Sequence, residues 1–116
     1  MLWRKRKRKI ETHLQNTVRF LGEQDGESER LLKSALIVEL RAVPEIKRAY
    51  LARVEYADGV HVALCIAGPQ SQLLVERIGS CFARIFAQHE HLDTLFLRLD
   101  REAELERVCA PFHRSD

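Results

Sequence analysis

The fold of this chain is decided by residues 46–67, whose sequence is IKRAYLARVEYADGVHVALCIA. Side chains alternate on both sides of Asp58-Gly59, and such a period of two is typical of a β-strand with one face buried. Asp-Gly between two alternating runs favours a hairpin, since glycine accepts the positive φ that these turns require. The segment therefore predicts two antiparallel strands, 46–56 and 60–66, joined by a tight turn.

Helices are predicted on both sides of this hairpin. We expect the preceding helix to begin at Ser28 as its N-cap and to end near Ala42, because Pro44 disfavours helical geometry at the residue before it. Its predicted apolar side holds Leu31, Leu32, Ala35, Leu36, Val38 and Leu40. The following helix is predicted to bury Leu74, Ile78, Cys81, Phe82, Ile85 and Phe86.

A third strand is predicted at residues 94–99, and a right-handed crossover makes it parallel to the second. Asp100 is then expected to cap a short last helix. Its apolar side is predicted to be Leu105, Val108 and Cys109, and its water-facing residues Arg101, Glu102, Glu104, Glu106 and Arg107.

The N-terminal part differs from the rest in charge. Residues 4–9 are all basic, and residues 5–21 are predicted to form an amphipathic helix that stops at Gly22. We interpret residues 1–27 as a basic arm and amphipathic helix, and residues 28–116 as one domain. The predicted class is α+β in the order ααββαβα, with a mixed, mainly three-stranded sheet packed against helices.

Two segments are similar to a known bacterial family. Residues 43–51, VPEIKRAYL, and residues 110–114, APFHR, resemble the strand and the closing phrase of the C-terminal domain of enhanced serine sensitivity (SseB) proteins. The resemblance covers roughly residues 28–114 and implies a stand-alone module of that type. It assigns no catalytic residues, and His113 stands where the family pattern has a tyrosine.

Charge and composition restrict the partners. The net charge is +2, but residues 10–116 carry 13 basic and 17 acidic side chains, a net charge of −4. Any binding to nucleic acid or to an anionic membrane surface would therefore depend on the arm, which is otherwise a solvated segment. The chain has no run of about eighteen apolar residues and no signal peptide pattern, which favours a cytoplasmic location. Three cysteines without a C-x-x-C pair predict reduced, buried thiols.

Motifs for catalysis and cofactor binding do not occur in the sequence. It contains no nucleotide-binding glycine loop, no H-E-x-x-H and no G-x-S-x-G. His89 and His91 are two positions apart at a predicted helix end, where their side chains would not converge on a metal. We therefore predict a protein that is not an enzyme and has no metal and no cofactor.

Two hypotheses of function remain. The first is a noncatalytic protein-interaction or regulatory module that binds a protein partner or a second copy of itself. Its candidate contact residues are Arg4, Lys5, Arg6, Lys7, Arg8, Lys9, Ile10, Leu14, Val18 and Leu21. The alternative is a small ligand-binding domain or enzyme, with a pocket between sheet and helix near Tyr50, His61, Cys65 and Arg98. Nucleic-acid binding through the arm is a weaker alternative.

Overall fold

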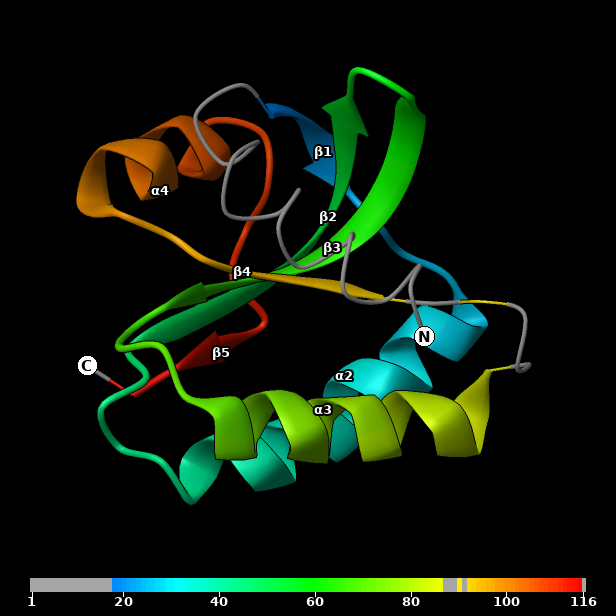
Figure 1. Cartoon of the computed structure of the whole chain (residues 1–116), viewed down its shortest axis with the longest axis vertical. Coiled ribbons are helices and arrows are strands. Elements are labelled where there is room, and N and C mark those ends of the chain that lie inside the picture. Colours follow the sequence, from blue (N-terminus) through cyan, green and yellow to red (C-terminus); the bar gives the residue numbers. More distant parts are fainter. Residues whose placement is uncertain (1–17, 87–89, 91, 116) are drawn as a thin grey trace.

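The computed structural model describes residues 18–86, 90 and 92–115. These residues form an α+β fold with three helices and a mixed sheet of five strands (Figure 1). Strands β1 to β4 lie in the order of their numbers, and β5 also pairs with β2. The predicted α+β class is confirmed, and the sheet has two strands more than the three that were predicted.

The predicted hairpin forms the centre of the sheet. Strands β2 (Arg48–Tyr56) and β3 (Gly59–Ala67) are antiparallel, and Tyr56 pairs with Gly59 across the turn. Gly59 has a φ of +132°, a conformation that residues with a Cβ rarely adopt. The glycine of the Asp58-Gly59 turn therefore has the positive φ that the sequence predicted.

The crossover after the hairpin also follows the prediction. Helix α3 (Gln72–Ile85) begins at Ser71, whose side chain accepts a hydrogen bond of 3.2 Å from the Leu74 amide. Strand β4 (Asp93–Phe96) then runs parallel to β3, as predicted for two strands joined by a helical crossover. The strand ends three residues earlier than predicted, because Leu99 already begins helix α4.

Helices α2 (Glu27–Arg41) and α3 pack together on one face of the sheet and run in opposite directions (Figure 1). Gly26, and not the predicted Ser28, precedes the first turn of α2. The core between these helices and the sheet includes Leu32, Leu36, Leu40, Leu51, Leu64, Leu74 and Ile78. Among the described residues, the outer side of this helix layer carries exposed side chains, including Leu31 and Val38 of α2.

Helix α4 (Leu99–Glu106) lies on the other side of the sheet (Figure 1). A second core on this side includes Tyr50, Ala52, Val54, Cys65, Leu95 and Leu105. Arg98 occupies the N-cap of α4, and Asp100 lies within the first turn, so Asp100 is not the cap that the sequence predicted.

Two short terminal strands share one edge of β2. Strand β1 (Arg19–Glu23) pairs with residues 52–55, and β5 (His113–Arg114) pairs with residues 48–49. The predicted helix over residues 5–21 is therefore wrong for residues 19–21, and residues 5–17 lie outside the described part. A helix at residues 19–21 would leave this edge of β2 without hydrogen-bond partners, and pairing with β1 supplies them.

Candidate functional site

Helix α2 has apolar residues on two opposite sides. Residues 27–41 contain no glycine or proline, and acidic residues in the first turn and Arg41 in the last suit the helix dipole. The inward residues Leu32, Leu36 and Leu40 are at most 1% exposed. Leu31 is 60% exposed and Val38 65% exposed, although the sequence placed both on the buried side. Seven residues make about two helical turns, so these two side chains share the outer side.

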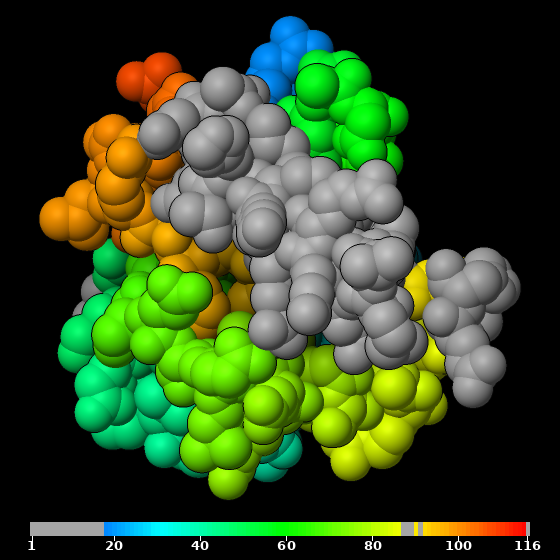
Figure 2. All heavy atoms as spheres, in the orientation of Figure 1, coloured from blue at the N-terminus to red at the C-terminus, as the bar shows by residue number. Residues whose placement is uncertain are grey.

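Helix α3 extends this outer surface. The guanidinium of Arg77 lies 3.4 Å from the carboxylate of Glu39 and links the two helices. Leu73, one turn before Arg77, is 62% exposed. Figure 2 shows α3 along the lower edge of the molecule, in green to yellow. We call Leu31, Val38 and Leu73 the outer apolar residues of the helix layer.

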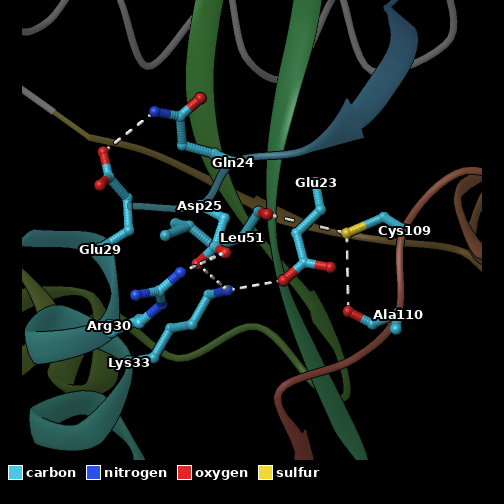
Figure 3. Close-up of polar contacts among 9 residues, drawn as sticks. All are labelled: Glu23, Gln24, Asp25, Glu29, Arg30, Lys33, Leu51, Cys109 and Ala110. Atoms are coloured by element: carbon cyan, nitrogen blue, oxygen red, sulfur yellow. Dashed lines mark hydrogen bonds and ion pairs between the residues drawn. The ribbon is translucent and has the colours of Figure 1, made fainter. Parts of the chain in front are cut away.

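The loop between β1 and α2 holds the start of α2 in place (Figure 3). The ammonium of Lys33 is 2.7 Å from Glu23 and 3.8 Å from Asp25, and its side chain is only 12% exposed. Arg30 forms a second ion pair with Asp25 at 3.2 Å. The hydrogen bond from Arg30, with a further bond from the Gly26 amide, lowers the pKa of Asp25. These contacts fix the direction in which the outer side of α2 points.

Cys109 lies close to this loop but is not arranged as a nucleophile (Figure 3). Its sulfur is 3.7 Å from the carbonyl oxygen of Leu51 and 3.6 Å from that of Ala110. Burial, together with the carboxylate of Glu23, raises the pKa of Cys109 to about 11. The thiol is therefore protonated at neutral pH, and a reactive cysteine needs the thiolate.

A polar network on the opposite side of the sheet anchors α4. Glu102 is 3% exposed and accepts hydrogen bonds from Arg48 Nε at 2.5 Å, Arg48 Nη2 at 3.0 Å and the Tyr50 hydroxyl at 2.5 Å. The hydroxyl also lies 3.1 Å from Glu106 Oε2. Burial, reinforced by the bond to Glu102, raises the pKa of Tyr50 well above its usual range. The hydrogen bonds from Arg48 and Tyr50 to the carboxylates of α4 hold this helix against β2.

The sequence predicts that Arg101 and Glu102 face water, and both predictions are wrong. Arg101 is 9% exposed, donates a hydrogen bond to the Val18 carbonyl, pairs with Glu104 and lies 4.8 Å above the ring of Phe20. The sequence did contain one indication that an acidic residue such as Glu102 would be buried. An arginine two positions before a core tyrosine shares that face of the strand, and a buried guanidinium requires an acidic partner.

The four predicted pocket residues do not line one pocket. Tyr50 and Cys65 pair across β2 and β3 and are both 0% exposed in a filled core. Burial raises the pKa of the Cys65 thiol far above its usual value. His61 lies near the hairpin turn beside Asp58, and Arg98 lies at the start of α4. A shallow hollow of about 190 Å³ between β1 and α4 is lined by Val18, Arg19, Phe20, Glu104, Arg107 and Val108.

The predicted contact residues are only partly described. Residues 4–10 and Leu14 lie outside the described part of the chain, so their role in binding stays a prediction. Val18 is 4% exposed in the core beneath α4, and Leu21 is half-buried at a bulge in β1. Val18 is therefore enclosed in the core, whereas Leu21 keeps part of its surface exposed and its role in binding stays a prediction.

Across residues 18–86, 90 and 92–115, no three His, Cys, Asp or Glu side chains are arranged to hold a metal ion. His89 and His91 lie outside these residues. None of the helices α2 to α4 has the length and apolar character needed to cross a bilayer.

No protein-family model, no curated protein and no solved structure matches this chain. The resemblance to the SseB C-terminal domain therefore stays a prediction from the sequence. Function has to be argued from the surfaces and side chains described above.

His113 gives the fold a dependence on pH. It pairs with Ala49, is 7% exposed, and its Nε2 has no hydrogen-bond partner in the described structure. Burial, with a contribution from the Arg41 guanidinium, lowers the pKa of His113 from its usual 6.5. The unfolded chain then takes up a proton at a higher pH than the folded chain. This part of the stability is present above the unfolded pKa and is lost as the pH falls through and below it.

We expect His113→Phe to flatten this loss between about pH 7 and about pH 5. The measurement is urea unfolding of both proteins across this range, with the difference between their free energies of unfolding plotted against pH. An unchanged difference across the range would show that His113 titrates alike in the folded and unfolded chains.

Proposed function

We propose that this chain is a noncatalytic protein-interaction module of the SseB C-terminal type, and that it binds its partner through the outer side of the α2–α3 layer. The observation that carries this proposal is the exposure of Leu31, Val38 and Leu73 on one layer. Apolar side chains exposed on one helix layer offer a surface that a binding partner can bury.

The state of the chemically reactive groups supports a noncatalytic role. Cys65 and Cys109 are buried, and burial raises the pKa of both thiols. The carboxylate of Glu102 is occupied by Arg48 and Tyr50. Groups that bind one another in the folded chain are poorly placed to serve as a nucleophile or a general base.

The cysteines also support a cytoplasmic location for this module. Cys65, Cys81 and Cys109 are all unpaired and buried. Free thiols are usual in a reducing compartment, whereas secreted domains of this size commonly use disulfides. Because all three thiols are free, we propose that the protein is located in the cytoplasm.

The test compares a variant of the proposed surface with a matched control. We expect Leu31→Glu/Val38→Glu to abolish cross-linking of the chain to its partners in cells, because two buried carboxylates would oppose an apolar contact. The control is Val60→Glu, since Val60 is also exposed, at 56%, but lies on the hairpin. Partner cross-links that persist in the double variant, or that are lost equally in the control, would show that this surface is not the binding site.

A further inference from the structure

We propose that the partner on this surface is a second copy of the chain, with the two α2 helices packed antiparallel across a twofold axis. This inference rests on the proposed function and adds the identity and orientation of the partner. It starts from five residues that follow one another along the outer side of α2, namely Glu27, Leu31, Ser34, Val38 and Arg41.

The spacing of these five residues makes them a single stripe. They are four, three, four and three positions apart, which is the repeat by which one helix presents a continuous seam to another. All five are exposed, while Leu32, Leu36 and Leu40 face the sheet. We call these five residues the α2 seam. It extends over fourteen residue steps, or about 21 Å.

The order of side chains in the α2 seam is self-complementary only in the antiparallel direction. When the two helices are antiparallel and cross at Ser34, Glu27 of one copy lies opposite Arg41 of the other, and Leu31 lies opposite Val38. A parallel arrangement would place Glu27 against Glu27 and Arg41 against Arg41. Opposite charges at the ends and apolar residues between them therefore fit a second copy related by a twofold axis.

The two charged ends of the α2 seam have no oppositely charged partner among the described residues, and Arg41 adds to burial in lowering the pKa of His113. In the described part of the chain, neither Glu27 nor Arg41 forms an ion pair, whereas Arg30 and Lys33 on the same helix do. The small side chain of Ser34 at the crossing point lets the two backbones approach closely.

The expected dimer is weak. One helix from each copy gives an interface at the low end of specific complexes, below about 1,200 Å² in total. Association should therefore depend strongly on protein concentration, and its charged pairs should weaken as salt screens them.

Charge reversal tests both the partner and the orientation. By sedimentation equilibrium of the full chain at low salt, we expect Glu27→Arg and Arg41→Glu each to weaken self-association about tenfold, because like charges then meet at both ends. The variant with both substitutions should recover association to within about threefold of wild type, since each reversed residue again meets its opposite. At high salt the four proteins should differ much less.

Disulfide trapping gives a second, independent readout. Because the native cysteines are all buried, a single exposed cysteine can be tested without removing them. Ser34→Cys places the new thiol on the proposed axis and should give a covalent dimer rapidly under mild oxidation. Ala103→Cys is the control, since residue 103 is exposed on α4, on the other side of the sheet.

Three results would overturn the second-copy inference. They are a wild type that stays monomeric at millimolar concentration, a double charge variant as weak as the single ones, and equal trapping of the two cysteine variants. Circular dichroism of each variant checks that α2 remains folded. If the chain is monomeric but other proteins still cross-link at Leu31 and Val38, only this inference fails. If those cross-links are also absent, the proposed function fails with it.

Discussion

Replacing Glu102 with alanine is expected to lower the free energy of unfolding by about 3–5 kcal/mol, the range for removing one partner of a buried ion pair. The guanidinium of Arg48 and the hydroxyl of Tyr50 both donate to this carboxylate, and Glu102 is 3% exposed. The variant leaves a partly buried positive charge without its counter-charge. A domain of this size is stable by only about 5–15 kcal/mol, so the loss is a large share of the total.

Removing both charges should cost less than removing one. Arg48→Met/Glu102→Leu replaces the pair by apolar side chains, which buried ion pairs commonly tolerate, while Tyr50 keeps Glu106 as an acceptor at 3.1 Å. We therefore expect the double variant to be more stable than Glu102→Ala. Urea unfolding of the single and double variants gives the coupling between the two positions.

Glu76→Ala is the control for these measurements, because Glu76 is an exposed acidic residue on α3. It should change the free energy of unfolding by no more than about 0.5 kcal/mol. A loss of similar size in Glu102→Ala would mean that Arg48 and Tyr50 find water in place of the carboxylate, and that α4 is held mainly by Leu105 and Arg101.

The elements that could be predicted from sequence are those with local signals. Asp58-Gly59 determines its own turn, and the apolar face of α3 repeats over four turns, so both were found. The parallel pairing of β3 and β4 follows from the helical crossover that joins them. Strands β1 and β5 were missed because five and two residues give no useful period. They form because the backbone groups along one edge of β2 are available to pair with them.

The buried charges could not be predicted from α4 itself. The sequence predicts that Arg101, Glu102, Glu104 and Glu106 of that helix face water, which is the usual outcome for charged residues. Glu102 is an exception because its partner Arg48 lies 54 positions earlier in the chain. Pairing over such a distance appears only once the strand and the helix are packed together.

The candidate site was missed for a related reason. Leu31, Leu36 and Val38 all look like core residues in a list of apolar positions on α2. The helix is too narrow to bury all of them against one sheet, and the sequence does not say which side is covered. The structure assigns the inner side to Leu36 and leaves Leu31 and Val38 outside.

Because Leu36 is buried and Val38 is exposed, substitutions at these two positions should differ in their effects on stability and on self-association. Leu36→Ala should lower the free energy of unfolding by about 2–5 kcal/mol, because Leu36 is 0% exposed and its loss leaves a cavity between helix and sheet. Val38→Ala should change it by no more than about 0.5 kcal/mol, because Val38 is 65% exposed. Both values come from urea unfolding at micromolar protein concentration.

Self-association should show the reverse order. At a temperature where both variants are folded, Leu36→Ala should dimerise like the wild type, and Val38→Ala should dimerise more weakly. Because a dimer of folded chains stabilises the folded state by mass action, the wild-type unfolding midpoint should also rise with protein concentration, and that of Val38→Ala should rise less. A Val38→Ala variant as unstable as Leu36→Ala at low concentration would mean that the outer side of α2 is covered within a single chain.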